Sequence, residues 1–325
     1  MSRWSQRRTR IAIAVVIVAV LGVTVGLAAW EYGRPRLILA TTTSTYDSGL
    51  LDYLLPEFEN RYLVKVDIVS VGTGQAIATA QSGDADVLLV HSRAAEDQFV
   101  HDGYGVHRVC VMYNDFIIIG PSSDPAGILG QTSASTSFKK IAAAGDAGNA
   151  IFISRGDNSG THNKEMAIWD QAGIDPVGES WYVETGQGMG DTLTVTDQQQ
   201  AYCLVDRGTW LAKKNTLGLV VLSEGDQILL NPYGMIQINP AMYPDLNHEM
   251  AQNLVAFMIS EAGQAKIASY TVGGEVLFKP LYGKCASITG CPTQSAELAH
   301  WGPISGNFGT STAALCEAHE CCHAH

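Results

Sequence analysis

The chain has 325 residues, of which 46% are hydrophobic, so it is long enough for two globular domains or one large α/β unit. Its formal net charge of −12 indicates an acidic surface, which disfavours binding to nucleic acid and to anionic lipid. The sequence contains no Walker-type phosphate loop and no heptad repeat, so any energy-transducing machinery is expected on another chain.

The N-terminus combines a basic flank with a long apolar run. Arg3, Arg7, Arg8 and Arg10 precede Ile11–Trp30, which carries no charge. This pattern is typical of a membrane-targeting signal and predicts that the rest of the chain is extracytoplasmic. The run is long enough to span a bilayer, which favours an uncleaved anchor over a cleaved signal peptide. We assign residues 1–36 to this N-terminal signal or membrane anchor.

The first expected strand is Leu37–Leu39, and the apolar stripe from Leu50 to Phe58 predicts the first helix. The hydroxyl residues Thr41–Thr45 lie between them. One hydroxyl is enough to cap a helix, so this run suggests a surface of hydrogen-bond donors. A flexible Thr-rich turn is the alternative.

A second strand, Val64–Val69, passes through small and hydroxyl residues at Ser70–Gln75 into an alanine-rich helix, Ala76–Ala80. The pair of glycines in this loop resembles the start of a dinucleotide-binding fingerprint, but Ile77 occupies the third glycine position, so the match fails. The next strand is Val87–Val90. Strands and helices that alternate at this spacing predict a mostly parallel sheet covered on both faces.

The second half of the chain continues this pattern. The long extended run Met112–Gly120 is expected to pass between two lobes. Further elements are expected at Phe138–Ala144 (helix), Trp181–Gly190 (strand and glycine-rich turn), Tyr202–Val205 and Leu217–Leu222 (strands), Gln227–Ile238 (return crossing), Met250–Ile259 and Gly263–Ser269 (helices) and Val276–Pro280.

The segment FISRGDNSGTH at 152–162 carries the strongest local signal for an anion site. A buried strand leads into a loop and then into a helix that opens near Ser159. Free backbone N–H groups, hydroxyls and the positive end of the helix dipole meet at such a start. Arg155 adds a planar fork of donors suited to an oxyanion, and Asp157 can orient it. An ordinary N-cap beside a surface arginine is the alternative.

Beyond about Cys285 the composition changes to Ser, Thr, Gly and Ala, and the chain ends CEAHECCHAH. Cys285 and Cys291 could form a small disulfide loop in an oxidising compartment. The terminal Cys and His residues have donor types that suit soft metals, but their spacing matches no known finger. We therefore predict no metal site and expect 285–325 to be a flexible tail.

Seven motifs together closely resemble the tungstate-binding proteins of tungstate-specific ABC importers and, more distantly, phosphate- and molybdate-binding proteins. The motifs are TTTS at 41–44, SVGTGQA at 70–76, GDADVLLVHS at 83–92, VMYNDFIIIGP at 111–121, SRGDNSGTH at 154–162, WYVETGQGMG at 181–190 and AYCLVDRGTW at 201–210.

The resemblance implies a type II periplasmic-binding-protein fold: two α/β lobes, each a mostly parallel sheet flanked by helices, with the ligand in the cleft between them. The implied divisions are 37–113 (lobe 1), 114–233 (lobe 2) and 234–284 (return to lobe 1). It also implies a non-enzymatic protein without a cofactor, which delivers tungstate or a related oxyanion to the membrane permease and ATPase of an ABC importer. The oxyanion-binding residues that it implies are Thr42, Thr43, Ser44, Ser70, Thr73, Gly74, Arg155, Ser159, Gly160 and Thr161.

The residues favour a fully deprotonated oxyanion over phosphate. Phosphate keeps a proton at neutral pH and is helped by a carboxylate acceptor, whereas this chain has Val90, His91 and Ser92 where phosphate binders place one. Tungstate and molybdate are not separated by sequence. Two other functions remain open: an anchored phosphate or oxyanion receptor, and a serine hydrolase that uses Ser159 or Ser44 with His91 or His162. The hydrolase lacks a GxSxG elbow.

Overall fold

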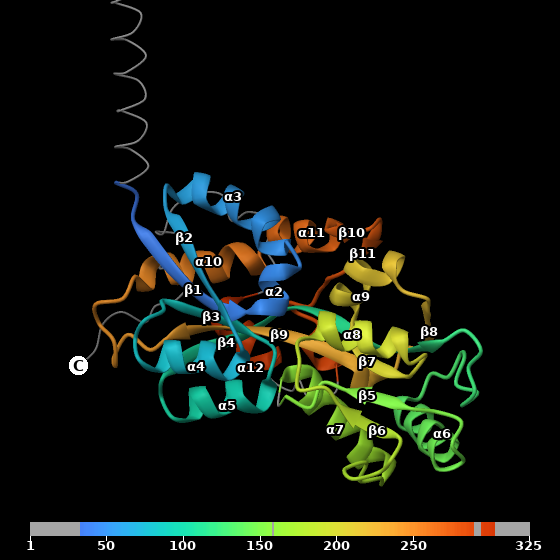
Figure 1. Ribbon diagram of the computed structural model, residues 1–325. Helices are drawn as coiled ribbons and strands as arrows, with labels where there is room; N and C mark the ends of the chain where they lie inside the picture. Colours follow the sequence, from blue (N-terminus) through green and yellow to red (C-terminus); the bar gives the residue numbers. More distant parts are fainter. Residues whose placement is uncertain (1–32, 158, 289–293, 303–325) are drawn as a thin grey trace, which may run out of the picture.

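The computed structural model describes residues 33–157, 159–288 and 294–302. In these ranges the chain forms an eight-stranded mixed sheet with helices on both faces, and two small two-stranded sheets (Figure 1). The strands of the large sheet are β1 (Arg36–Thr42), β2 (Lys65–Val71), β3 (Val87–Val90), β4 (Gly105–Pro121), β7 (Cys203–Asp206), β8 (Leu219–Ser223), β9 (Leu230–Ile238) and β12 (Lys279–Pro280).

The strand order along the main path is β12-β4-β9-β3-β1-β2. Strand β1 lies between β2 and β3 and is parallel to both, so the carboxyl ends of these three strands meet at one edge. Strand β9 is antiparallel to β3 and to β4. The later part of β4 pairs instead with β7 and β8, again antiparallel. Strand β4 therefore joins two groups of elements that are distant in sequence.

The first group packs helices on both faces of β1–β3. Its helices are α2 (Thr43–Asp47), α3 (Leu50–Tyr62), α4 (Thr73–Gln81), α5 (Arg93–His101), α10 (His248–Ile259) and α11 (Glu261–Ser269). Leu37 and Leu39 point into the core shared with α3 and α10, whereas Ala40 packs with α4 and α5 on the other face. This alternation follows from the two-residue period of a strand.

The second group surrounds the later part of β4. Its elements are α6 (Ala134–Asp146), β5 (Phe152–Ser154), α7 (Gly160–Ala172), β6 (Tyr182–Glu184), α8 (Met189–Gln198) and α9 (Arg207–Lys213). Strands β5 and β6 are parallel, and Phe152 bridges to Tyr202 just before β7. Phe138, Phe152 and Trp169 pack against one another in the core beneath α6 and α7.

The remaining short elements lie between these groups or at the end of the described chain. They are the 3-10 turns η1 (Lys214–Thr216), η2 (Gln227–Leu229) and η3 (Cys285–Ser287), the hairpin β10 (Thr271–Val272) and β11 (Glu275–Val276), and helix α12 (Gln294–Trp301).

The sheet differs from the predicted mostly parallel arrangement. Among the strands named here, parallel pairs occur within β1–β3 and between β5 and β6, because β4 and β9 cross the molecule in opposite directions and pair along most of their length. The predicted α/β fold with helices on both faces is confirmed. The boundaries at 113, 233 and 284 stay predictions.

The structure also corrects two expectations for the region after Cys285. Cys285 forms a disulfide with Cys110 on β4 rather than with Cys291, which lies outside the described residues. Part of the expected flexible tail folds as η3 and α12, because Glu297 is buried and accepts hydrogen bonds from the Cys110 amide and from Arg108. The His- and Cys-rich end at 316–325 also lies outside the described residues.

No helix in the described ranges is long and apolar enough to span a bilayer. The predicted anchor run at 11–30 lies outside those ranges and stays a prediction.

Candidate functional site

The first predicted segment, Thr42–Ser44, lies at the carboxyl end of β1 where α2 begins. Thr42 caps the helix: its Oγ1 accepts from the Thr45 amide at 3.4 Å and lies 3.1 Å from Ser44 Oγ. The Thr41 and Thr45 hydroxyls are buried and bonded within the protein, so part of the hydroxyl run is structural. Thr43 is exposed at the first position of α2, and Ser44 is half-buried.

The second predicted segment, Ser70–Gly74, lies beside the first. Ser70 pairs in register with Thr41 across β1 and β2. Gly72 is the N-cap of α4, so Thr73 and Gly74 form the first turn of that helix, where backbone N–H groups are unpaired within the helix. A Cβ on Gly74 would meet no atom within 4 Å, which indicates open surroundings.

The third predicted segment joins β5 to α7. Ser159 is the N-cap of α7, and its hydroxyl accepts from the His162 amide at 3.3 Å, so Gly160 and Thr161 form the first turn. Arg155 Nη2 donates to Asp157 Oδ2 at 2.5 Å, and Asp157 Oδ1 accepts from the Ser159 amide at 3.1 Å. Asp157 therefore orients Arg155 against the helix start.

Arg155 keeps one donor unused. Its Nε is buried and has no hydrogen-bond partner among the described residues. Burial by itself would raise the pKa of Asp157, but hydrogen bonds from Ser159 and the charge of Arg155 outweigh it and hold that pKa below its usual value. A charged arginine with a buried, unsatisfied N–H is suited to an anionic ligand.

His91, at the end of β3, brings the first and third segments together. Its Nε2 lies 3.3 Å from Ser44 Oγ. A Cβ placed on Gly160 would lie only 3.1 Å from His91 Cε1, so the start of α7 packs directly against the imidazole. No hydrogen bond among the described residues links Arg155 or Ser70–Gly74 directly to the other predicted segments. The contact through His91 therefore joins Ser44 of the first group of elements to Gly160 of the second.

A set of polar residues that the sequence reasoning did not select surrounds His91. Its Nδ1 lies 3.1 Å from Asn231 Oδ1, and Asn231 Nδ2 donates to Asn114 Oδ1 at 2.9 Å. The Tyr233 ring lies 4.8 Å from the imidazole, centroid to centroid. Asn114 and Asn231 are buried in the long strands β4 and β9. Buried amides within apolar strands were a signal in the sequence that could have pointed to this site.

Burial keeps this imidazole neutral. Burial lowers the pKa of His91 to about 4, even though the Asp206 carboxylate and the bond to Asn231 act in the opposite direction. The ammonium group of Lys164 on α7 also opposes a charged imidazole. Lys164 Nζ donates to the backbone carbonyls of Ile228 and Leu230, at 2.8 and 3.2 Å, which ties α7 to the start of β9.

Glu165 supports the Arg155 loop from below. Its Oε2 accepts from Ser154 Oγ at 2.9 Å, and Ser154 Oγ in turn accepts from the Gly156 amide at 3.1 Å. Tyr182 and Trp169 donate to Oε1 at 2.7 and 3.3 Å. Burial raises the pKa of Glu165 to about 7 despite these three donors.

One geometric feature favours the hydrolase alternative. Ser44, His91 and Asn231 form a chain of hydroxyl, imidazole and side-chain oxygen. An imidazole with a pKa of about 4 is, however, a weak general base at neutral pH, and a neutral amide replaces the carboxylate that stabilises an imidazolium. The arrangement orients donors well but is poorly suited to activating a nucleophile.

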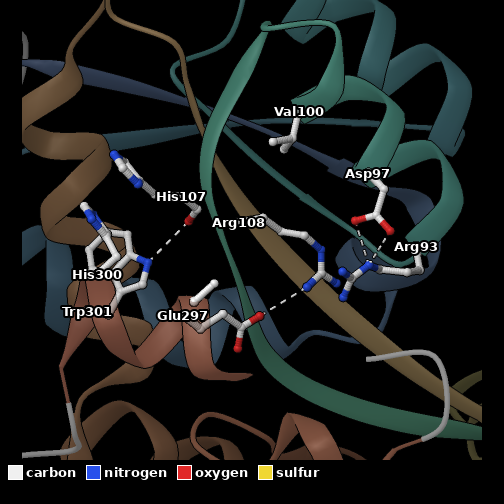
Figure 2. Close-up of a pocket in the computed structure, with 9 residues that line it drawn as sticks. Arg93, Asp97, Val100, His107, Arg108, Glu297, His300 and Trp301 are labelled. Atoms are coloured by element: carbon white, nitrogen blue, oxygen red, sulfur yellow. Dashed lines mark hydrogen bonds and ion pairs between the residues drawn. The ribbon is translucent and has the colours of Figure 1, made fainter. Parts of the chain in front are cut away.

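A separate hollow of about 290 Å³ lies between α5 and α12 (Figure 2), and none of the predicted binding residues lines it. Arg108, which lines this hollow, pairs with the buried carboxylates of Glu96, at 2.7 Å, and Glu297, at 3.3 Å. Cys110, Cys285 and Glu297 bring possible metal-ligand atoms within 4.8 Å of one another, but the disulfide uses both sulfurs. This region holds α12 onto β4.

Comparison with known proteins agrees with the geometry. Residues 30–262 match the family model of the PBP superfamily domain. The chain is 53% identical over 250 residues to an ABC transporter anion-binding protein of Haloferax volcanii, covering 75% of this chain and 72% of that one. It is 48% identical over 251 residues to the tungstate-binding protein TupA of Peptoclostridium acidaminophilum, covering 77% and 85%.

Solved structures give the same result. The tungstate-binding protein TupA of Desulfovibrio alaskensis G20 superposes with a TM-score of 0.71 at 43% identity, covering 76% of this chain and 98% of that one. The tungstate ABC transporter protein of Geobacter sulfurreducens gives 0.66 at 49% identity, covering 72% and 98%. The resemblance drawn from the sequence motifs is confirmed, and the chain belongs to the PBP superfamily and, within it, to the family of the tungstate-binding proteins TupA.

Proposed function

We propose that this protein is an extracytoplasmic solute-binding protein that captures tungstate, or the similar molybdate, and delivers it to an ABC importer. The observation that carries the proposal is the meeting of Ser44 and the start of α7 at His91, with the unused Arg155 Nε on the loop in front of that helix. Hydroxyls, helix-start amides and a guanidinium are all donors, which suits an anion that carries no proton. The names of the relatives support the same ligand class.

The ligand-binding residues in this proposal are Thr42, Thr43, Ser44, Ser70, Thr73, Gly74, Arg155, Ser159, Gly160 and Thr161. They lie in three segments where a strand ends and a helix begins: β1 to α2, β2 to α4 and β5 to α7. Each charge-assisted hydrogen bond contributes on the order of 1.5–3 kcal/mol, so a handful of them suffices for tight binding. No bound cofactor and no catalytic residue form part of the proposal.

Capture in this proposal involves a hinge between two lobes, divided at about residues 113, 233 and 284. The hinge lies where β4 and β9 pair side by side, with Met112 opposite Tyr233 and Asn114 opposite Asn231. An anion that touches donors from both groups of elements favours the closed form by its differential affinity. The permease and ATPase subunits of the importer are the partners, and the segment at 1–36 attaches the protein to the outer face of the membrane.

The experiment is a comparison of oxyanions on the purified protein, lacking residues 1–36. Thermal shift and titration calorimetry are run with tungstate, molybdate, sulfate and phosphate. We expect strong stabilisation by tungstate and molybdate and little by phosphate. Preference for phosphate would favour an anchored phosphate receptor instead. Turnover of an ester or phosphate substrate that is abolished by Ser44→Ala would favour the hydrolase, for which the Ser44, His91 and Asn231 chain is the motivating observation.

A further inference from the structure

The hydrogen bonds around His91 define its tautomer. Asn231 directs its NH₂ group to Asn114 Oδ1, at 2.9 Å, so its Oδ1 faces His91 Nδ1, at 3.1 Å. An amide oxygen only accepts, so Nδ1 carries the proton. In a neutral imidazole Nε2 is then an acceptor, and the Ser44 hydroxyl must donate to it across 3.3 Å.

This arrangement conflicts with the proposed ligand. The Ser44 hydroxyl has a single proton, and it is spent on His91 rather than being available to an oxyanion. The start of α7 lies beside this pair, because Gly160 packs against Cε1 of the same ring. A fully deprotonated dianion that enters here would meet the oxygen of the Ser44 hydroxyl instead of its proton, which is unfavourable.

We propose that His91 takes up a proton from solvent when the oxyanion binds. Nε2–H then donates to Ser44 Oγ, and the Ser44 proton is released to donate to the ligand. The inference rests on the proposed function and deepens it. It makes His91 a positioning residue, because its protonation turns the Ser44 hydroxyl from an acceptor into a donor toward the ligand.

The groups that face the imidazole explain why the proton arrives with the ligand. Burial and Lys164 on α7 keep the ring neutral in the free protein, with Asp206 at the end of β7 as the opposing charge. Tyr233 on β9 stays a neutral phenol because burial and the Asp206 charge raise its pKa well above the usual range. The two negative charges of a bound dianion a few ångströms away stabilise a charged imidazole by several kcal/mol at an effective dielectric of about 20. This corresponds to a rise of several units in the pKa of His91.

Linkage gives the sign of the pH dependence. Because the complex holds one more proton than the free protein, tungstate affinity falls as pH rises from about 4, the pKa of free His91, through the higher pKa in the complex. Within that window the Kd rises by up to about tenfold per pH unit. Tungstate carries no proton at neutral pH, so the ligand itself cannot be the source of this dependence.

The test is titration calorimetry with sodium tungstate at about pH 7 in buffers of different ionisation enthalpy, which counts the protons bound. The expected results are uptake that approaches about one proton for the wild type, uptake near zero for His91→Gln, and unchanged uptake for His107→Gln, a remote histidine. Uptake should persist in Ser44→Ala, with weaker binding.

A second measurement needs no variant. The ring nitrogen shifts of labelled histidine, recorded with and without tungstate, should show one imidazole change from neutral to charged. Tungstate binding without proton uptake, or uptake that survives in His91→Gln, would overturn the inference while leaving the proposed function intact. Absence of tungstate binding in the wild type would instead overturn the proposed function.

Discussion

Removing the Arg155 side chain should cost most of the tungstate affinity. Within the described part of the chain, the Arg155 side chain makes one hydrogen bond, from Nη2 to Asp157, so its buried Nε and an adjacent N–H of the same planar fork can serve the ligand. Two charge-assisted hydrogen bonds at about 1.5–3 kcal/mol each amount to about 3–6 kcal/mol. Arg155→Ala is therefore expected to raise the Kd for tungstate by about 10²–10⁴-fold.

Two further variants separate geometry from charge. Arg155→Lys keeps the charge but lacks the fork, so we expect an intermediate loss of about tenfold or more. Arg61→Ala removes the same charge from the exposed i,i+4 pair with Glu57 on α3 and should leave the Kd within about threefold of the wild type.

The assay is titration calorimetry, with circular dichroism to verify that each variant folds. The Arg155 loop packs on β5 through Gly156 and Ser154, and that contact does not involve the arginine side chain, so the fold should survive. A Kd for Arg155→Ala within about threefold of the wild type, which is less than about 1 kcal/mol, would refute the assignment of Arg155 as a ligand-binding residue.

Three further changes test the surroundings of the site. Glu165 has a folded-state pKa of about 7, above its unfolded value, so its contribution to stability is present at low pH and is lost as pH rises through 7. Relative to Glu165→Gln, the wild-type free energy of unfolding should therefore fall by about 3 kcal/mol between about pH 4.5 and 8. A difference between the two proteins that stays constant with pH in urea melts would contradict this. Gly160→Ala brings a methyl group to 3.1 Å from His91 Cε1, so tungstate affinity in calorimetry should fall by about tenfold while the melting temperature changes little. Unchanged affinity would show that tungstate binding does not depend on the close approach of the α7 start to His91. The Cys110–Cys285 disulfide spans 175 residues, so reducing it, or making Cys285→Ser, should lower the free energy of unfolding by up to about 5 kcal/mol in the chain-entropy account. The tungstate affinity should not change. An altered affinity would mean that α12 and the binding site are coupled.

The strand-to-helix corners could be predicted from the sequence because their signals are local. The apolar strands β1, β2, β3 and β5 and the cap residues that follow them lie within short windows. Ser159, for example, was predicted at the helix start and is the N-cap of α7. The family resemblance added the ligand class, which no local pattern could supply.

Features that depend on long-range pairing were missed. Strand β4 begins at Gly105 rather than Met112, because it continues along β9 through a register shift near His107, whose φ is +53°. The charged residues there interrupt the apolar pattern that marks a strand. Arg108 is instead neutralised by Glu96 from α5 and Glu297 from α12, residues 12 and 189 positions away. Helix α5 and helix α12 were likewise not predicted.

The sequence placed His91 where phosphate binders carry a carboxylate and made it a candidate base of the hydrolase alternative, but it did not predict the hydrogen-bond partners of the ring. Asn231 is 140 positions away, and Asn114 is 117 positions from Asn231, so the tautomer of His91 is set by contacts that only the fold creates. The same burial that makes the ring neutral also makes it sensitive to a nearby dianion, because both effects scale with the low local dielectric. Because the Nδ1 proton of His91 is used by Asn231, the ring can donate toward Ser44 only if protonation accompanies binding. The pairing of β4 with β9 places Asn114 beside Asn231, and these two residues set the His91 tautomer that determines what Ser44 offers to the ligand.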